Sequence, residues 1–517
     1  MNAADERSVI WYRPQSQPSG PPADITHQKD RLCVTVTRGN ALSSLYRKSI
    51  LLPYHDLDVA VLVQHCRRAQ DGEDMALSPF RAIKRAIDFD RRMAIAMTEL
   101  NAESGPVCTY GSGPVRITFM FGPEANEFIF RNARLFRWRG GFETLIPLAG
   151  ETALLVSDGP GHDRRRELVL PAFHRTRLDT YLTVLRENVD ALVDDWRPGQ
   201  EVNVYDLFRP LVRRSTVRGF FGPDLAEAER AGLGADMELV LDTMNYSLPK
   251  QQILQRVPNP IWRRAQAAIA RIDRRVLAEI ARRRSGEPGE DILGLLLDSG
   301  EMSDPELRDM VVSLIVASYD TTSSALAWAV YALWSSRDSL RKARAEVRAE
   351  LGDRTPALAD LRDLTYLDWV TSEILRMYPP AMAGARQAAE PFTFGGHRVR
   401  KGEMVVFSQY VTHRLPRLWV DPDRFWPERW DRDRPGYRRP SSYEYLPFGV
   451  GARRCLGSNL ARAEITLTLA RLLQRTELDL LSHDVEPGGF TAMSPRGGVR
   501  VRVSETHRMP ETAAAAL

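Results

Sequence analysis

One cysteine lies in the glycine-rich loop Phe448-Gly449-Val450-Gly451-Ala452-Arg453-Arg454-Cys455-Leu456-Gly457, directly after two arginines. The residues that follow, 458–465, carry apolar side chains at helical spacing and predict a helix. Glycines allow close approaches that a Cβ would block, so backbone N–H groups can reach the cysteine sulfur. A cysteine beside arginines at a helix N-terminus should be held as the thiolate, the form that ligates metals.

The spacing Phe-Gly-x-Gly-x-Arg-x-Cys-x-Gly in this loop resembles the haem-ligand signature of the cytochrome P-450 superfamily, and every specified position is filled. For an isolated cysteine the alternative is a buried residue in a glycine-rich turn. The resemblance implies that Cys455 is the axial ligand of the iron in haem b (iron protoporphyrin IX). It also implies that Phe448 and Gly449 belong to the cofactor-binding loop, with the phenyl ring beside the sulfur. Arg453 would bind a haem propionate. A thiolate ligand pushes electron density onto iron and favours O–O cleavage.

The same resemblance implies the architecture of the chain. We expect a mainly α fold with small β-sheets (α+β), in which one large haem domain contains a long central helix. The expected domain covers 76–505. Residues 1–75 would be an N-terminal extension, either partly disordered or the result of a start codon placed too early, with Met75 as the alternative start. Residues 506–517 are expected to form a disordered tail.

Charge and composition restrict the remaining function classes. The chain has 517 residues, 43% of them hydrophobic, and a net charge of +4, so it can bury a large core. Arginine clusters at 164–166 and 282–284 could suggest nucleic acid. Because no concentrated basic tail or recognised binding motif accompanies them, we expect solvated helix faces and no nucleic-acid partner.

The cysteines and the apolar runs indicate a compartment. Cys33, Cys66, Cys108 and Cys455 form no C-x-x-C pair, which argues against a zinc site or a disulfide framework and fits a reducing cytosol. No run of eighteen apolar residues occurs, and the first thirty residues contain prolines and charges in place of a signal-peptide core. We therefore expect a cytoplasmic, soluble protein of bacterial type with no membrane span.

The N-terminal half shows regular patterns from residue 80 onward. A helix is predicted over 80–100, a hairpin over 107–120 and a further helix beginning near 122. Another helix is predicted over 202–221. Residues 240–262 contain several prolines and are expected to be a flexible region between two helices, which in relatives forms a lid over the substrate channel.

His162 and Arg166 are four residues apart and share one face of a predicted helix. On their own they could be an ordinary exposed pair. They are followed by Leu170-Pro171-Ala172-Phe173, where the family has Leu-x-Pro-x-Phe, and the resemblance then implies that both bind haem propionates. Arginine suits this role because its planar fork pairs bidentately with a carboxylate.

A long helix is predicted after Ser303, which with Glu306 forms a capping box. No glycine or proline occurs from residue 306 to 336, so the helix should span roughly 45 Å. Its middle contains Asp320 and Thr321. In the structural alternative, the hydroxyls bond back to carbonyls four residues earlier and the acid faces solvent. The resemblance implies instead that this pair relays protons to bound oxygen. Ser318 departs from the family pattern, which has glycine, and adds a hydroxyl to the oxygen-binding groove.

Glu373 and Arg376 form an E-x-x-R sequence, which is weak alone. The resemblance joins them to Arg429 in a buried structural triad. Two other pairs share the spacing and are expected to be exposed: Glu227/Arg230 and Glu279/Arg282.

Further residues follow from the resemblance in the C-terminal part. Arg386 is at the position of a propionate-binding arginine. Short strands are predicted at 392–394, 399–400 and 404–407, and a hairpin is predicted between 490–493 and 499–503, with its tip near substrate. The expected substrate-pocket residues are Val316, Ala317, Ala383, Gly384 and Thr491.

The implied activity is insertion of one oxygen atom from O2 into a lipophilic small molecule, by hydroxylation or epoxidation. Because the chain shows no flavin or ferredoxin module, two electrons should come from NAD(P)H through a separate ferredoxin or flavodoxin and its reductase. Arg453, Arg454 and Arg462 would steer an acidic partner. We expect a monomer. The alternatives are a peroxide-using or isomerising haem-thiolate enzyme and a non-enzymatic haem sensor.

Overall fold

The computed structural model describes residues 25–28, 31–38, 46–53, 79–111 and 116–507. The chain divides into two compact units, 1–88 and 89–517. In the first unit, β1 (Ile25–Gln28), β2 (Arg31–Arg38) and β3 (Tyr46–Pro53) form an antiparallel sheet in that order. The alternative start at Met75 lies outside the described residues.

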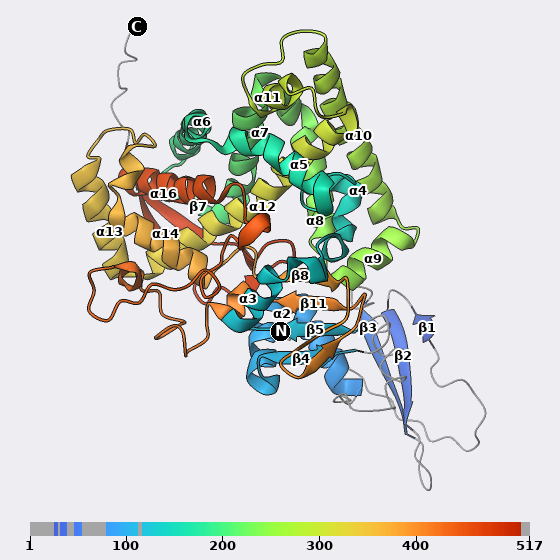
Figure 1. The fold of residues 1–517 in the computed structure, drawn as a ribbon. Helices are drawn as coiled ribbons and strands as arrows, with labels where there is room; N and C mark the ends of the chain where they lie inside the picture. Colours follow the sequence, from blue (N-terminus) through green and yellow to red (C-terminus); the bar gives the residue numbers. More distant parts are fainter. Residues whose placement is uncertain (1–24, 29–30, 39–45, 54–78, 112–115, 508–517) are drawn as a thin grey trace, which may run out of the picture. The chain divides into compact units, whose positions relative to one another are not determined.

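The second unit is mostly helical (Figure 1). Helix α2 (Pro79–Ser104) spans the boundary between the units and is interrupted at Arg92, whose φ of −146° is not helical. The helices that follow are α3 (Pro123–Arg131), α4 (Ile146–Ala149), α5 (Gly159–Val169), α6 (Arg175–Asp194), α7 (Val204–Ala228), α8 (Gly234–Met244), α9 (Leu248–Arg256), α10 (Pro260–Arg284), α11 (Ile292–Asp298), α12 (Asp304–Ser335), α13 (Arg337–Glu350), α14 (Thr365–Met377), α15 (Gln409–Thr412) and α16 (Ser458–Arg475).

Small sheets complete this unit. A five-stranded sheet has the order β4-β5-β11-β8-β6, with β5 and β11 parallel and the other neighbours antiparallel. Its strands are β4 (Val107–Tyr110), β5 (Ile117–Met120), β6 (Phe136–Arg137), β8 (Gly384–Ala388) and β11 (Met404–Phe407). The remaining strands are β7 (Glu201–Asn203), β9 (Phe392–Phe394), β10 (His397–Val399), β12 (Thr476–Leu480), β13 (Pro487–Gly488), β14 (Ser494–Pro495) and β15 (Arg500–Thr506). The predicted fold class, mainly α with small sheets, is confirmed.

Helix α12 runs through the middle of the second unit, with α14 and α16 on one side and α10 on the other (Figure 1). The predicted capping box is present, because the Ser303 N–H donates to Glu306 Oε2 over 3.1 Å. By length and composition alone, α12 could cross a membrane, and among the described residues it is the helix that meets this test. Because 78% of its most apolar window is buried inside the protein, α12 is a core helix.

The predicted lid region differs from the expected flexible loop. Residues 248–256 form α9, and α8 and α10 extend into the same region. Pro249 and Pro260 lie in the first turns of α9 and α10, where the missing N–H has no helical acceptor to lose. Asn259 caps α10 by accepting from the Trp262 N–H over 2.8 Å. The prolines therefore start helices in a segment where the sequence analysis took them as breakers.

Two further elements differ from expectation. Strand β7 occupies 201–203, so the helix predicted from 202 begins at Val204, and Gly222 interrupts it with a φ of +79°. The predicted hairpin between 490–493 and 499–503 is wrong, because β13 pairs with β14 while β15 pairs with β12 and β7. Residues 489–493 form the hairpin tip. Strand β15 extends through Thr506, one residue into the tail predicted as disordered, and 508–517 lie outside the described residues.

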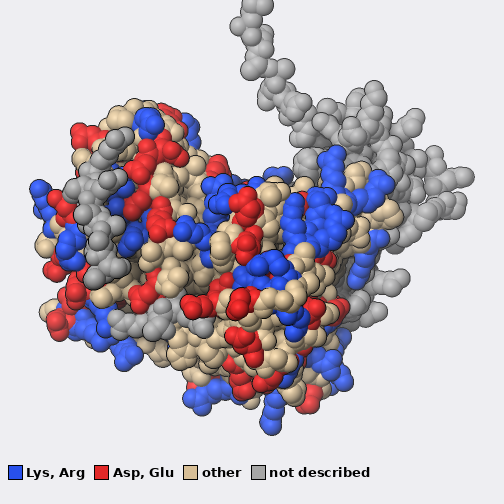
Figure 2. Space-filling model, turned by 90° about the horizontal axis from the view of Figure 1, so that it is seen from above, with Lys and Arg blue, Asp and Glu red and all other residues tan. Residues whose placement is uncertain are grey.

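The arginine clusters are only partly the solvated faces that we expected. Arg165 and Arg283 are buried, and so is Glu279, which was predicted to belong to an exposed pair. Arg283 Nε donates to Glu279 Oε1 over 2.6 Å, and another of its nitrogens donates to Asp291 Oδ1 over 2.7 Å. Figure 2 shows Lys and Arg side chains interspersed with Asp and Glu on the face that it draws.

The E-x-x-R residues form a buried ionic cluster with Arg429. Arg376 Nε and a second guanidinium nitrogen donate to the two oxygens of Glu373, both over 2.9 Å. Arg429 Nε donates to Glu373 Oε1 over 3.3 Å, and the Trp430 indole donates to Oε2 over 3.0 Å. Glu373 and Arg376 have no exposed surface. The carboxylate therefore connects α14 to the one-turn helix 427–430.

Replacing Glu373 with Ala should lower the free energy of unfolding by about 3–5 kcal/mol, because two guanidinium groups would stay buried without their carboxylate. Urea unfolding followed by circular dichroism measures this change. Glu227→Ala is the matched control, since Glu227 and Arg230 share the i,i+3 spacing but are exposed. The control should show no resolvable change, and equal effects of the two substitutions would contradict the structural role of the buried cluster.

Candidate functional site

The Cys455 loop is closed by its own backbone. The Cys455 N–H donates to the Phe448 carbonyl over 2.9 Å, and Gly449 and Gly451 have φ values of +66° and +70°, which favour glycine. Helix α16 begins three residues after the cysteine. The Gly457 N–H hydrogen-bonds the sulfur, so a backbone donor reaches it as the glycine-rich sequence predicts.

The protonation state of Cys455 differs from the expectation of a thiolate. Burial raises the pKa of the Cys455 thiol, and the opposing effects of the Gly457 N–H and of the charges on Arg166 and Arg454 do not outweigh it. The residue nevertheless keeps solvent-accessible surface. The polypeptide alone therefore presents an accessible thiol in crowded surroundings, and a directly coordinated metal ion would be needed to deprotonate it.

Two of the predicted propionate-binding arginines lie against the same aromatic ring. The guanidinium carbon of Arg386, on β8, is 3.5 Å from the centroid of the Trp138 ring, and that of Arg453 is 5.1 Å away. Arg386 donates to the Ala385 carbonyl over 2.7 Å, and no carboxylate of the described residues forms an ion pair with it. Burial, helped by the charge on Arg453, lowers the pKa of Arg386 to about 9. Trp138 was not identified from the sequence.

Helix α5 adds two more basic groups to this region. His162 is buried, and burial together with the charges on Arg453 and Arg166 holds its pKa below the ordinary value. Arg166 donates to the Arg454 carbonyl over 2.7 Å, which joins α5 to the cysteine loop. Asp163 accepts from His162 Nδ1 over 2.8 Å. The structure therefore brings the predicted basic residues of α5 to the cysteine loop.

This collection of basic groups fits a ligand that carries carboxylates. Arg453 is partly neutralised, since it donates to Asp158 over 3.0 Å and to the Ser157 carbonyl over 2.8 Å. Arg386 has no such partner, and a buried guanidinium without an anion is costly. An accessible thiol beside unneutralised cations suits a metal complex with anionic side groups, so the residues present fit a haem with two propionates.

The middle of α12 keeps accessible surface on one face, between buried residues on both sides. Ala317 is exposed and Thr321, four residues later on the same face, is partly exposed. The Thr321 hydroxyl donates to the Ala317 carbonyl over 2.7 Å, as in the structural alternative. Asp320, however, is buried and does not face solvent. Burial is the main cause that raises the pKa of Asp320.

Ser318 does not add a free hydroxyl to this face. Its Oγ donates to the Ile315 carbonyl over 3.0 Å and is also 3.0 Å from Thr216 Oγ1 of α7. The expected extra hydroxyl in the oxygen-binding groove is therefore held between two helices.

The other predicted pocket residues lie in different surroundings. Val316 and Ala383 are partly buried apolar residues. Thr491, at the hairpin tip, donates to Asp320 Oδ2 over 3.1 Å. At Gly384 a Cβ would lie 2.4 Å from the Phe407 ring, so packing inside the sheet explains this glycine without a role in a pocket.

Glu464 is a candidate that sequence reasoning missed. It is buried on α16, where it accepts a short hydrogen bond from the Tyr181 hydroxyl and one of 3.3 Å from Thr322, the residue after Thr321. Burial raises its pKa to about 7. The signal was available in the sequence, because Glu464 follows Leu460 by four residues on the apolar face of a predicted helix.

The chain is similar to a known family and to proteins of that family. The family model described as Cytochrome P450 matches residues 79–495. A protein described as putative cytochrome P450 139, from Mycobacterium tuberculosis, is 41% identical over 420 residues, which are 80% of this chain and 97% of that protein.

A relative with a named reaction and a solved structure also match. Cyclooctat-9-en-7-ol 5-monooxygenase from Streptomyces melanosporofaciens is 32% identical over 375 residues, which are 71% of this chain and 81% of the relative. The structure of retinoic acid-bound cyanobacterial CYP120A1 superposes with a TM-score of 0.72 and 28% identity, covering 79% of this chain and 93% of that chain.

The raised pKa of Glu464 gives the protein a specific pH dependence. The folded state holds the proton more tightly than the unfolded state, where the carboxyl has its ordinary pKa of 4.5. This contribution to stability is therefore complete below about pH 4.5 and is lost as the pH rises through about 7. Relative to Glu464→Gln, the wild type should lose about 3 kcal/mol of unfolding free energy between about pH 4.5 and about pH 8. Urea unfolding across this range measures the difference, and parallel pH profiles would contradict the raised pKa.

Proposed function

The chain belongs to the cytochrome P450 family and is a haem-thiolate monooxygenase, and on this premise we propose which of its residues carry the reaction and what it oxidises. Bound haem would supply the activation of O2 with two externally supplied electrons, for insertion of one oxygen atom into the substrate. The observation that carries the assignment of residues is the buried, unneutralised guanidinium of Arg386 beside the loop of an accessible thiol.

Cys455 would hold the haem iron through its sulfur. Binding of the iron would deprotonate the thiol although burial raises its pKa, and the Gly457 N–H would stabilise the negative charge on the sulfur. Phe448 and Gly449 shape the loop that holds this donor, since the Phe448 carbonyl accepts from the cysteine N–H.

Arg386, Arg453, His162 and Arg166 bind the two haem propionates. Arg386 gains the carboxylate that it lacks among the described residues, and the loss of mutual repulsion among the four groups adds to the binding free energy. Trp138 holds Arg386 and Arg453 in place, because both guanidinium groups contact its ring. A propionate of the cofactor would thus provide the carboxylate that the described residues do not place beside Arg386.

Asp320 and Thr321 handle protons on the exposed turn of α12. The raised pKa of Asp320 lets its carboxyl hold a proton closer to neutral pH than an ordinary aspartate does. Because the Thr321 hydroxyl donates to the Ala317 carbonyl, its oxygen is left to accept a hydrogen bond from a proton donor at the exposed face. Thr321 therefore positions a proton donor, and Asp320 supplies and replaces protons.

We assign the substrate to the terpenoid class. Cyclooctat-9-en-7-ol, named in one relative, and retinoic acid, bound in the matched structure, are isoprenoid compounds with largely hydrocarbon surfaces. Val316, Ala317 and Ala383 supply apolar surface near the proposed site. Such a pocket binds by burial of apolar area, with a few polar groups fixing the orientation.

The relatives are bacterial proteins. We place the electron-transfer partner, a ferredoxin or flavodoxin served by its reductase, on the cysteine side of the protein. Of the three arginines expected there, Arg453 turns inward to Asp158 and Arg462 donates to Asp368, which leaves Arg454 as the exposed cation. We place the protein in the cytoplasm as a monomer, with α12 buried in the core.

Replacing Cys455 with Ser should abolish the red-shifted absorption band of the carbon monoxide complex of the reduced holoprotein, because that band requires a thiolate ligand. Absorption spectra of the reduced protein with carbon monoxide measure it. Cys108→Ala is the control, since Cys108 lies on β4 within the sheet. Persistence of the red-shifted band in Cys455→Ser would show that another residue ligates the iron.

Cyclooctat-9-en-7-ol and retinoic acid should change the visible spectrum of the oxidised holoprotein as they displace solvent from iron. A titration of each compound, with straight-chain fatty acids of similar size as controls, measures the affinity. The terpenoid assignment predicts at least tenfold tighter binding of one isoprenoid than of the fatty acids, which corresponds to about 1.4 kcal/mol. Equal or tighter binding of the fatty acids would contradict it.

A further inference from the structure

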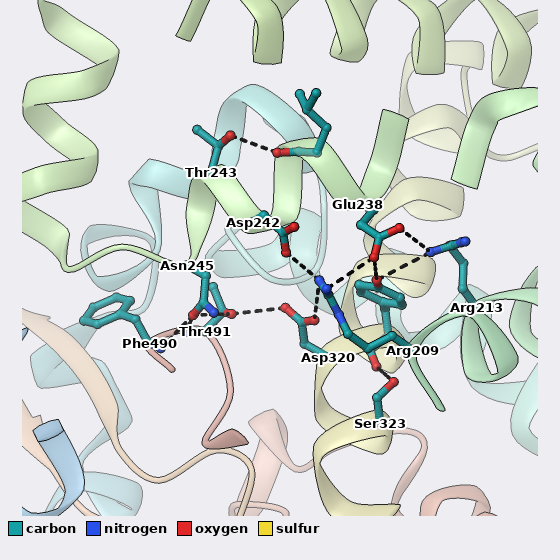
Figure 3. Close-up of polar contacts among 12 residues, drawn as sticks. Arg209, Arg213, Glu238, Asp242, Thr243, Asn245, Asp320, Ser323, Phe490 and Thr491 are labelled. Carbon is teal, nitrogen blue, oxygen red and sulfur yellow. Dashed lines mark hydrogen bonds and ion pairs between the residues drawn. The ribbon is translucent and has the colours of Figure 1, made fainter. Parts of the chain in front are cut away.

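The Asp320 carboxylate lies where three other elements meet α12 (Figure 3). Arg209 of α7 approaches Asp320 Oδ1 to 3.9 Å, but Arg209 also donates to Asp242 over 2.5 Å and to Glu238 over 3.2 Å, both on α8. Thr491 of the β13–β14 tip donates to Asp320 Oδ2 over 3.1 Å. Among the described residues, the hydrogen-bond donor to this carboxylate is therefore the Thr491 hydroxyl.

Thr491 has a second acceptor, which is the side chain of Asn245 directly after α8. Its hydroxyl is 3.2 Å from Asn245 Oδ1, almost the same distance as from Asp320. The orientation of the Asn245 amide is fixed, because Oδ1 also accepts the N–H groups of Phe490, over 2.7 Å, and of Thr491, over 3.1 Å. Both neighbours of the hydroxyl are therefore acceptors when Asp320 is ionised.

A hydroxyl has one hydrogen, so it serves only one of these acceptors at a time. When Asp320 is ionised, the hydroxyl donates to its carboxylate. When Asp320 is protonated, the carboxylic acid donates to Thr491 Oγ1, and the hydroxyl turns to donate to Asn245 Oδ1. Every group keeps a partner in both states, so the side chain of Asp320 does not have to move when its proton leaves or returns.

We propose that Thr491 and Asn245 are positioning residues that hold Asp320 in one place in both of its protonation states, by reversing a two-member hydrogen-bond chain. The inference rests on the proton-handling role proposed for Asp320. It explains why the hairpin tip and the end of α8 meet at this acid, since two backbone hydrogen bonds to Asn245 Oδ1 fix the tip in both states.

The other ionisable groups around Asp320 do not hold its side chain in place in both protonation states. Glu238 and Asp242 repel the ionised carboxylate, and Arg209 attracts it from 3.9 Å while paired with both of them. Burial and, to a smaller extent, the charge on Asp320 raise the pKa values of Tyr205 and Tyr319. The hydroxyl of Tyr319 hydrogen-bonds Glu238 and that of Tyr205 hydrogen-bonds Ser494, so neither takes the place of the Thr491 hydroxyl at the Asp320 carboxylate.

Thr491→Val tests the proposal, because it keeps the shape of the side chain and removes the hydroxyl. The holoprotein is labelled with ¹³C in its aspartate side chains, and the carboxyl stretching band of Asp320, assigned by its loss in Asp320→Asn, is titrated with pH by infrared spectroscopy. Loss of the donor to the ionised form should tighten proton binding to Asp320 about tenfold, a rise of about one pKa unit. The rest of Asp320's surroundings are Arg209, Glu238, Asp242, Tyr205 and Tyr319, which the substitution leaves in place.

Two control variants and a double-mutant cycle test whether the change in the Asp320 titration comes from the Thr491 hydroxyl. Thr491→Ser should restore the wild-type titration, and Thr243→Val should not change it, because the Thr243 hydroxyl on α8 donates to the Leu239 carbonyl and, among the described residues, does not bond to Asp320 (Figure 3). Asn245→Ala should alter the titration of Asp320 in the wild-type background and not in the Thr491→Val background, since its effect acts through the hydroxyl.

A wild-type titration in Thr491→Val, or equal effects of Asn245→Ala in both backgrounds, would overturn the proposal. The titration needs no turnover, so it fails only if the hydrogen-bond chain is wrong. An error in the proton-handling role would appear separately, as unimpaired product formation by Asp320→Asn.

Discussion

The arrangement depends on positive charge that the fold gathers and does not neutralise. Arg166, Arg386 and Arg453 come from α5, β8 and the cysteine loop, and burial together with the charges of neighbouring arginines lowers the pKa values of His162, Arg386 and Arg453. Only Arg453 has a nearby aspartate as an ion-pair partner among these arginines. Such a cluster costs folding free energy until an anion binds. Binding of a cofactor with two carboxylates therefore stabilises the folded protein as well as equipping it for the reaction.

The same principle applies to the thiol. Burial raises the pKa of the Cys455 thiol, and the charges on Arg166 and Arg454 do not lower it to its ordinary value. In the proposed site, coordination to iron would reverse this rise, so that one haem would complete both the thiol and the cationic cluster. The loop contributes geometry in advance, with the Phe448 carbonyl and the Gly457 N–H fixing the position of the cysteine. The polypeptide fixes the position of Cys455, and binding of the cofactor would determine whether its thiol is ionised.

The sequence predicted the elements that rest on local signals. The capping box at Ser303, the hairpin over 107–120 and the turn at Gly395 all involve residues close together in the chain. It failed where distant residues decide the outcome. Glu279 looked like an exposed partner of Arg282, but Arg283 of the same helix turns inward to bind it and the Phe221 carbonyl. Strand β15 likewise pairs with β12 and with β7, the latter almost 300 residues earlier, and not with residues 490–493 as predicted.

The candidate site shows the same division. Cys455, Asp320 and Thr321 belong to short patterns and could be identified by resemblance, whereas Trp138 and Glu464 matter only because of what packs on them. The lone acid on an apolar helix face was visible at Glu464, but its partners, Tyr181 and Thr322, come from other helices. No local pattern specifies such a meeting of three helices.

Three consecutive polar residues in the middle of α12 lie in three different surroundings. Successive residues of a helix point about 100° apart, so Asp320, Thr321 and Thr322 must face different neighbours. Asp320 meets the hairpin tip and α7, Thr321 lies on the accessible face, and Thr322 reaches Glu464 on α16. Two buried acids with raised pKa values thus lie at the residues on either side of the partly exposed Thr321, one at position 320 itself and the other, Glu464, bonded to Thr322. Burial makes α12 a core helix, and burial also raises the pKa values of Asp320 and Glu464. The stability of the fold and the retention of protons by these two acids therefore have the same physical cause.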